Sequence, residues 1–248
     1  MVVRFLVAIP ALNEGAVIAS VLASLAEVHP LRDVVVIDDG SHDDTGRIAR
    51  EAGAHVLTHA FNIGVGAAMG TAFKYAAAHG YEAVVQFDGD GQHRPEHIAE
   101  LVAASAHADI VIGSRFAEGG TFPSSAARRG VQRCIAWVVS LYARTKLTDA
   151  TSGFRIAGPR ALAVFSVHYP VEWLGDTVES IVLATRQGLT VSEIPVGMNE
   201  RAGGTPSQSV LRATLYTGRI IFILVLAAIR TVPPQLRHLR NTRKEARA

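Results

Sequence analysis

Short runs of Val and Ile alternate with longer Ala-rich segments through the first half of the chain. The short runs end in polar residues or Gly, whereas apolar residues in the longer segments recur at helical spacing. The pattern predicts strands near Val2–Ile9, Asp33–Ile37, His55–Thr58, Ala83–Phe87 and Ile110–Gly113, each followed by a helix. Near-continuous apolar strands suit a parallel sheet that helices cover on both faces. The sequence therefore predicts an α/β fold with a central, mainly parallel sheet.

This alternation ends after residue 115. Residues 118–123 are rich in Gly and polar residues, which predicts a mobile loop. The further predicted elements are an apolar helix over Ala126–Ala143, a strand at Gly153–Ile156, a helix around Asp176–Gln187, a strand at Val191–Val196 and a last helix over Val210–Arg230. Because Gly203–Pro206 reads as a flexible link, we expect one folded domain over residues 1–206, followed by an amphipathic helix and basic tail over residues 207–248.

Composition narrows the class of protein. The chain has 248 residues, of which 49% are hydrophobic and 19% charged, and this excludes a mainly disordered chain. A single cysteine, Cys134, cannot form an intrachain disulfide, which excludes a secreted module held together by disulfides. A reducing compartment is the natural location, and the N-terminal segment is not typical of a signal peptide.

Positive charge gathers at the C-terminal end. Residues 201–248 contain nine Lys and Arg and one acidic residue, whereas acidic residues are in excess over the rest of the chain. A basic tail is typical of proteins that bind nucleic acid or an anionic membrane surface. Nucleic acid is disfavoured, because no aromatic residues interleave with the arginines beyond Phe222. The apolar run Ile220–Ile229 would rise only about 15 Å as a helix, so we expect it to lie along a membrane or in a core rather than to span a bilayer.

Acidic residues follow several predicted strands. In parallel α/β sheets, ligands bind outside the carboxyl ends of the strands. Asp38 and Asp39 follow the second strand, and the fourth ends in Asp88-Gly-Asp90-Gly-Gln92. Two carboxylates separated by one Gly, with an amide oxygen two residues on, predict a site for Mg²⁺ or Mn²⁺ that leaves positions open for a diphosphate.

Two competing motifs are weaker. Gly64, Gly66 and Gly70 open a helix after a strand, as a dinucleotide-binding fingerprint does, but the last spacing is one residue too long. We therefore expect these glycines to serve close helix packing. His93 and His97 have the spacing of zinc ligands on a helix, but Pro95 marks the first helical turn, so they would not share a face.

The motifs together resemble those of family 2 glycosyltransferases, in particular the dolichyl-phosphate and polyprenyl-phosphate sugar synthases. The resemblance covers residues 3–207 and rests on five segments in order: residues 7–14 (VAIPALNE), 36–41 (VIDDGS), 88–93 (DGDGQH), 113–115 (GSR) and 152–155 (SGFR). It implies the GT-A fold and metal-dependent transfer of a sugar, with inversion, from a UDP- or GDP-sugar.

The resemblance also implies roles for individual residues. Pro10, Leu12 and Glu14 would line the nucleotide pocket, and Asp38 would contact the base. The metal ligands would be Asp88, Asp90 and Gln92, and Arg115 and Arg201 would meet the donor diphosphate or the acceptor phosphate. Guanidinium groups suit phosphate oxygens, and a metal offsets charge on the departing nucleoside diphosphate.

The acceptor decides whether a base is needed. A polyprenyl phosphate is already an anion and mainly needs placing, whereas a hydroxyl acceptor needs a general base. Asp149 and Asp176 are the carboxylates that we would test for a chemical role, although either could cap a helix or pair with an arginine. Family members often have a Lys shortly after the segment that matches residues 201–207, and Gln208 and Ser209 stand here instead.

Three functional hypotheses follow. The first is sugar transfer to a polyprenyl phosphate by a protein that lies peripherally on the cytoplasmic face of the membrane, through its basic tail or with a membrane-protein partner. The second keeps the donor and gives it a hydroxyl acceptor on a saccharide or small metabolite. The third is a nucleotide-sugar-binding protein without turnover. The sequence does not distinguish the sugar, the nucleotide or the metal.

Overall fold

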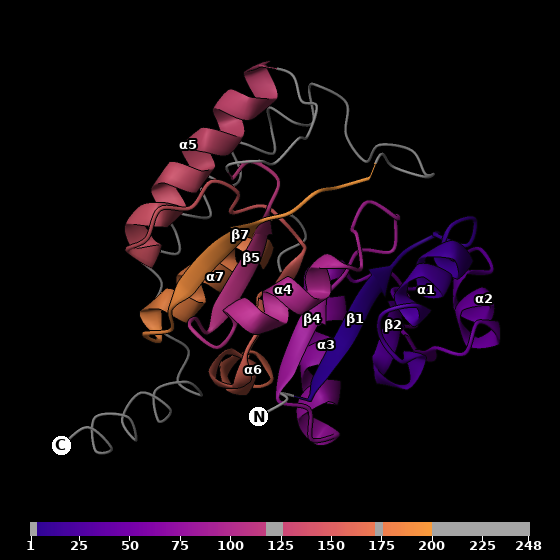
Figure 1. The fold of residues 1–248 in the computed structure, drawn as a ribbon. Coiled ribbons are helices and arrows are strands. Elements are labelled where there is room, and N and C mark those ends of the chain that lie inside the picture. The colour runs from indigo at the N-terminus through magenta and orange to yellow at the C-terminus, as the bar shows by residue number, and fades with distance from the viewer. Residues whose placement is uncertain (1–3, 118–125, 172–175, 200–248) are drawn as a thin grey trace.

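Helices cover both faces of one seven-stranded sheet in the structure, a computed structural model that describes residues 4–117, 126–171 and 176–199 (Figure 1). The strands are β1 (Phe5–Ala11), β2 (Val34–Asp38), β3 (His55–Thr58), β4 (Ala83–Gln86), β5 (Ile110–Ser114), β6 (Arg155–Ala157) and β7 (Val191–Pro195). The helices are α1 (Ile18–Ala26), α2 (Thr45–Glu51), α3 (Val65–Ala78), α4 (His97–Ala104), α5 (Ala126–Ala143), α6 (Pro159–Phe165) and α7 (Asp176–Arg186), with a 3-10 turn at Leu31–Asp33.

The sheet is parallel except at β6. Its order is β3-β2-β1-β4-β6-β5-β7, and β6 pairs antiparallel with both β4 and β5. The pairs β1 with β2, β1 with β4, β2 with β3 and β5 with β7 are parallel. This arrangement confirms the predicted α/β fold, and each predicted strand is found within a few residues of its expected bounds.

Alternation along the strands builds two apolar layers. In β1, Leu6 and Ala8 face a core completed by α3, α5, α6 and α7, whereas Val7 and Ile9 face a core completed by α1, α2 and α4. Successive side chains of a strand point to opposite faces of the sheet, so a strand buried on both sides reads as an unbroken apolar run. The Val-rich segment of β2, buried along its whole length, has the same cause.

The order in which the chain adds strands to the sheet reverses between β1 and β4, which are themselves parallel. From β1 the chain proceeds outward through β2 and β3, and α3 then returns it to β4 on the other side of β1. The connections that follow the two strands run in opposite directions at such a point and leave a crevice at the carboxyl edge of the sheet. Ligands bind there in this class of fold. The residues after β1, β2, β4 and β5 therefore lie along one edge.

Two features were not predicted from the sequence pattern. Helix α6 begins at Pro159 after Gly158, and a Pro in the first turn is a helix-start signal. The antiparallel insertion of β6 depends on pairing between distant segments, which short apolar runs do not encode.

Several predictions concern residues outside the described ranges. These are the loop at 118–123, the helix over Val210–Arg230, Arg201 and the division of the chain at residue 206. Within the described residues, no helix is long and apolar enough to cross a membrane.

Candidate active site

Two loops interlock beyond β1 and β2. The backbone N–H of Asn13 donates to Ser41 Oγ at 3.0 Å, and that of Glu14 donates to Thr45 Oγ1 at 2.8 Å. The Asp38 carboxylate accepts a hydrogen bond of 3.0 Å from the Ser41 N–H, which fixes the start of the second loop. Pro10, near the end of β1, and Leu12, just after it, are half-buried, and Pro10 lies opposite Ile37 in the sheet. The structure therefore gathers, at the carboxyl ends of β1 and β2, the three residues predicted to line the nucleotide pocket and Asp38, which was predicted to contact the base.

Asp39 organises the loop before α3. Its carboxylate accepts hydrogen bonds from the backbone N–H groups of Ile63 and Gly64 at 3.1 and 2.7 Å, and it contacts His59 Nδ1 at 2.7 Å. Gly64 has a φ of 107°, a conformation that other residues rarely adopt. A Cβ at Gly66 would lie 2.5 Å from the Pro170 carbonyl oxygen. Gly66 thus serves close packing, as predicted, whereas Gly64 serves the geometry of the turn, which was not predicted.

The turn after β4 holds the acidic motif. A Cβ on Gly153 would lie 2.9 Å from both Asp88 carboxylate oxygens, so the Asp88 side chain occupies space that any larger residue at 153 would fill. The Asp88 side chain is 37% exposed. Asp90 Oδ1 accepts a hydrogen bond of 3.1 Å from the Gln92 N–H, and the Gln92 carbonyl accepts one of 2.9 Å from the Asn199 N–H. The chain after β7 thereby fixes the turn.

The donor set of this turn fits a hard divalent cation. Asp88, Asp90 and Gln92 offer two carboxylates and an amide oxygen within five residues, which is the chemistry that Mg²⁺ and Mn²⁺ prefer. Among the described residues, no group of three or more His, Cys, Asp and Glu side chains is placed so as to hold a metal ion. A cation here would therefore depend on these three oxygen donors together with oxygens of a ligand.

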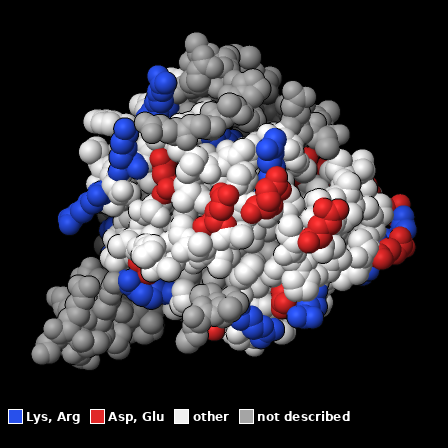
Figure 2. Space-filling view, in the orientation of Figure 1, with Lys and Arg blue, Asp and Glu red and all other residues white. Residues whose placement is uncertain are grey.

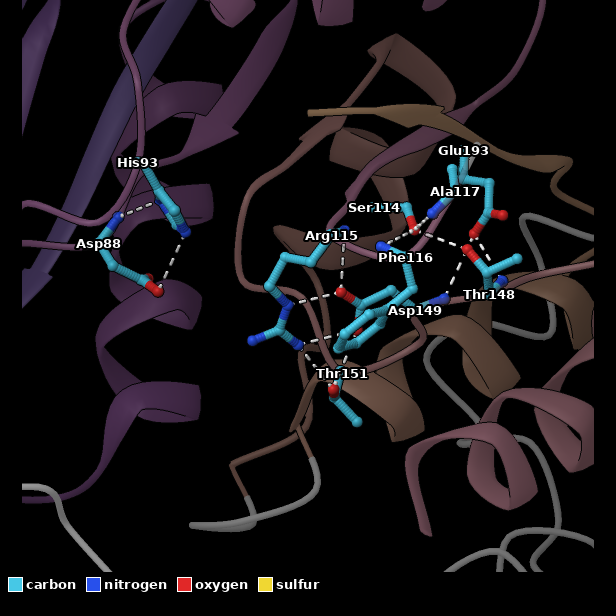
Figure 3. Close-up of polar contacts among 10 residues, drawn as sticks. All are labelled: Asp88, His93, Ser114, Arg115, Phe116, Ala117, Thr148, Asp149, Thr151 and Glu193. Carbon is cyan, nitrogen blue, oxygen red and sulfur yellow. Dashed lines mark hydrogen bonds and ion pairs between the residues drawn. The ribbon is translucent and has the colours of Figure 1, made fainter. Parts of the chain in front are cut away.

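His93 holds Asp88 in place, a contact that the sequence analysis missed. The Asp88 N–H donates to His93 Nδ1 at 2.9 Å, so the proton of a neutral His93 resides on Nε2, which lies 3.5 Å from Asp88 Oδ2 (Figure 3). Burial lowers the pKa of His93 below its ordinary value, against the opposing charges of Asp88 and Asp90. The ring stacks on Phe154 at 4.7 Å. The signal available in the sequence was that His93 directly follows the acidic motif.

Arg115 and Asp149 form a closed ion pair beyond β5. Arg115 Nε and Nη2 donate to the two Asp149 carboxylate oxygens at 2.6 and 2.9 Å, and the Arg115 N–H donates at 3.2 Å (Figure 3). The Asp149 side chain is fully buried, and that of Arg115 is 14% exposed. Thr151 Oγ1 bridges the pair through hydrogen bonds of 3.0 and 3.1 Å. Both residues were predicted to belong to the site, and the structure joins them to each other.

A second layer of hydrogen bonds supports this pair. Glu193 of β7 accepts hydrogen bonds from the backbone N–H groups of Thr148 and Asp149 at 2.7 and 3.4 Å. Ser114 Oγ lies 2.6 Å from Thr148 Oγ1 and accepts from the N–H groups of Phe116 and Ala117 (Figure 3). In Figure 3 the Arg115 guanidinium lies between Asp149 and the pair of Asp88 and His93. Its positive charge contributes to the lowered pKa of His93.

Asp176 begins α7 in a buried polar cluster. Its carboxylate is 3.4 Å from the Tyr169 hydroxyl, and burial raises the pKa of Asp176 above its ordinary value while the charge of Arg155 opposes that shift. The negative charge of Asp88 adds to the rise. Arg155 Nη1 donates to Ser180 Oγ at 3.0 Å, but Arg155 Nε and Nη2 have no hydrogen-bond partner among the described residues. Asp176 therefore lies close enough to Asp88 for the charge of Asp88 to act on it.

Residues 6–168 match the sequence model of the family described as "Glycosyl transferase family 2". The chain is 32% identical, over 228 residues, to an undecaprenyl-phosphate mannosyltransferase of Micrococcus luteus, covering 85% of this chain and 93% of that protein. It is 31% identical, over 223 residues, to a polyprenol monophosphomannose synthase of Mycolicibacterium smegmatis, covering 83% and 81%.

The fold also has solved counterparts. It resembles the crystal structure of glucosyl-3-phosphoglycerate synthase from Mycobacterium tuberculosis in complex with Mn²⁺, UDP and glucosyl-3-phosphoglycerate. The TM-score is 0.67 at 21% identity, over 90% of this chain and 79% of that one. This likeness identifies the architecture as the GT-A fold.

Proposed function

The chain belongs to glycosyltransferase family 2, and from this premise we propose that it moves one sugar from a UDP- or GDP-sugar to a polyprenyl phosphate, with inversion and with the help of a divalent metal. Membership of the family makes it a hexosyltransferase. The observation that carries the proposal is the placement of Asp88 and Arg115 together at the carboxyl edge of the sheet, beside the interlocked loops of β1 and β2.

The donor occupies the loops after β1 and β2 in this proposal. Pro10, Leu12 and Glu14 line the nucleotide pocket, and Asp38 contacts the base. Asp38 is 6% exposed, and the hydrogen bond from the Ser41 N–H to its Oδ1 fixes its carboxylate at the start of the second loop. Rigid anchoring of both loops limits the entropy lost when the nucleotide binds.

Asp88, Asp90 and Gln92 hold the metal in this proposal. The bound metal would supply positive charge to the diphosphate of the departing nucleotide. His93 keeps the Asp88 carboxylate oriented, and the space beside Gly153 accommodates it. Arg115 adds a second positive charge, and its engagement with Asp149 fixes the plane of its guanidinium.

The acceptor phosphate has to be held in the right place, but it needs no general base to remove a proton. It is an anion at neutral pH, so placing it in line with the anomeric carbon is the main requirement. Arg115 is a described residue that suits this task, and Arg201 is proposed from the resemblance alone. The names of the relatives from M. luteus and M. smegmatis, which specify undecaprenyl phosphate and polyprenol, support this acceptor class.

A hydroxyl acceptor is the second candidate, and the raised pKa of Asp176 favours it. A carboxylate whose pKa lies nearer neutrality is a better general base. Both Asp149 oxygens are engaged by Arg115, so Asp176 is the stronger of the two proposed catalytic carboxylates. If Asp176→Asn binds donor but loses turnover on a hydroxyl acceptor, the result would support this candidate. Full turnover of the same variant on a polyprenyl phosphate would oppose it.

The test offers the protein a panel of donors together with one lipid acceptor. The purified protein is incubated with Mg²⁺ or Mn²⁺, a panel of UDP- and GDP-sugars and a short polyprenyl phosphate, and sugar is followed into the organic-extractable fraction. We expect a metal-dependent extractable product with one donor. Release of nucleoside diphosphate without lipid product would contradict the proposed acceptor, and donor binding without any release would indicate a binding protein.

A further inference from the structure

Helix α5 packs on one side only. Ile135 and Val139 are buried in the core beneath it, and the helix contacts α7. Trp137 and Leu141 lie four residues apart, hence on one face of the helix, and are 64% and 62% exposed. An exposed Trp next to an exposed Leu presents a large apolar surface to solvent. Such a surface on a folded domain commonly marks an interaction site.

The surroundings of this apolar face are basic. Arg133 on α5, and Arg144 and Lys146 just after it, are exposed. The sequence contains no Asp or Glu from residue 126 to residue 148. In Figure 2, Lys and Arg side chains lie along the upper left of the molecule, where Figure 1 places α5, and most of the Asp and Glu side chains lie towards the middle and right. We call Arg133, Trp137, Leu141, Arg144 and Lys146 the outer face of α5.

The same helix connects two parts of the candidate site. The chain leaves the site after Arg115–Ala117, forms α5, and returns at Thr148 and Asp149. The buried side of α5 packs on α7, whose first residue is Asp176. A surface that docks on the outer face of α5 would therefore lie against the element that joins Arg115 to Asp149 and packs on α7.

We propose that the outer face of α5 rests on the surface of an anionic lipid bilayer. This inference rests on the proposed function, because an enzyme that uses a polyprenyl phosphate meets its acceptor at a membrane. Trp favours the boundary between hydrocarbon and headgroups, and Leu adds buried apolar area. Arg133, Arg144 and Lys146 supply attraction to anionic lipid, at about a fivefold gain in binding per basic residue near the surface.

Charge favours a membrane over a second copy of the chain. In a symmetric contact the same patch meets itself, so two outer faces would bring six basic side chains together. An anionic bilayer instead complements that charge. The proposed surface lies within the described domain and is distinct from the basic tail of residues 201–248.

The binding test uses the full chain with Trp173→Phe, which leaves Trp137 as its one tryptophan. We expect phosphatidylcholine vesicles containing phosphatidylglycerol to shift Trp137 emission to the blue, and high salt to weaken the effect. In sedimentation with these vesicles, Trp137→Ser with Leu141→Ser should weaken binding at least about tenfold. A variant with reversed charge at Arg133, Arg144 and Lys146 should bind the anionic vesicles more weakly than the unmodified chain binds vesicles of phosphatidylcholine alone.

Matched controls are available on another part of the surface. Val28 is 53% exposed and the Arg32 side chain is 82% exposed, so Val28→Ser and Arg32→Glu make comparable changes away from α5. We expect both controls to bind vesicles as the unmodified chain does. Equal losses in the controls and the α5 variants, or Trp137 emission that vesicles do not change, would overturn the proposal. Burial of Trp137 in a dimer without lipid would also overturn it.

Turnover separates this proposal from the function on which it rests. The Trp137 and Leu141 variants should keep their turnover on a short, water-soluble polyprenyl phosphate and lose about tenfold or more on a long-chain acceptor carried in vesicles. Equal turnover on both acceptors would overturn the docking proposal. Absence of product from the unmodified chain on either acceptor would overturn the proposed function, and vesicle binding would still report on α5.

Discussion

The carboxylates of Asp88 and Asp149 lie at the same edge of the sheet in opposite surroundings. Asp88 is 37% exposed and is approached by a neutral His93 ring at 3.5 Å, whereas Asp149 is fully buried and both its oxygens accept from Arg115. The Asp88 carboxylate is therefore accessible to a cation, whereas the Asp149 carboxylate is neutralised by the Arg115 guanidinium. The comparison teaches that burial and hydrogen-bond partners, more than residue type, decide which of two carboxylates is left exposed and which is fully paired.

Removing the exposed carboxylate should have the largest effect. We expect Asp88→Ala to lower turnover about a thousandfold, because the metal that offsets charge on the leaving diphosphate loses a ligand. Steady-state transfer to a polyprenyl phosphate at saturating Mn²⁺ measures this. Asp44→Ala is the control, since that carboxylate is 67% exposed on a different loop. Unchanged turnover and unchanged metal dependence in Asp88→Ala would contradict the assignment.

Removing the buried carboxylate should act first on stability. Asp149→Ala removes the carboxylate that neutralises the largely buried Arg115 guanidinium, which should lower the free energy of unfolding by about 3 kcal/mol in denaturant titrations. The KM for donor or acceptor should rise as well, because Arg115 is no longer oriented. The double variant with Arg115→Ala should lose less stability than the sum of the single variants.

Asp109 provides a matched control for that experiment. It pairs with Arg160 at 3.0 Å and is nearly buried, but the pair lies at Thr190, before β7, rather than at the site. Asp109→Ala should destabilise the fold and leave both KM values unchanged. A similar rise in KM for both Asp109→Ala and Asp149→Ala would show that loss of stability alone explains the Asp149 result.

His93 tests how the exposed carboxylate is kept in place. His93→Phe preserves ring stacking on Phe154 and removes both ring nitrogens that contact Asp88. We expect the affinity for Mn²⁺ to fall about tenfold, as for other residues that orient a metal ligand. Calorimetric titration with Mn²⁺ and a nucleoside diphosphate measures this. His97→Gln serves as control, because His97 contacts Gly197 and Glu100 instead; an equal loss there would argue against a specific role for His93.

Asp176 is a third carboxylate, buried but with a raised pKa, and its substitution should have the smallest effect of those predicted here. Burial raises the pKa of this carboxyl above its ordinary 3.8 in the folded chain. The folded state therefore retains the proton to higher pH than the unfolded state, and this contribution to stability is lost as pH rises above about 4. Asp176→Asn should thus be more stable than the unmodified chain at pH 7 without metal, and the difference should vanish near pH 4. Thermal unfolding across this range checks the sign, and a constant difference would contradict it.

Much of the fold was predictable because local pattern and final structure agree. The helix Ala126–Ala143 and the strand His55–Thr58 have the predicted bounds, since their apolar spacing is regular and their ends carry polar residues or turn signals. The order of the strands was not predictable, because the insertion of β6 between β4 and β5 depends on contacts across more than forty residues.

In the candidate site, too, local features were predictable from the sequence and contacts between distant residues were not. The acidic motif and Arg115 were identifiable because their chemistry is compressed into a few adjacent residues. The link from Arg115 to Asp149 spans 34 positions, and the contact of His93 with Asp88 depends on how the turn closes. The sequence allowed Asp149 to be a base or an arginine partner, and the structure shows the pairing with Arg115.

Direct binding of Mn²⁺ in the presence of a nucleoside diphosphate tests the central distinction. The amount of bound Mn²⁺ is measured by electron paramagnetic resonance for the unmodified chain, Asp88→Asn and Asp149→Asn at equal folded concentration. We expect Asp88→Asn to lose most of the bound Mn²⁺ and Asp149→Asn to retain it. Retention in Asp88→Asn together with loss in Asp149→Asn would contradict the roles assigned to the two carboxylates.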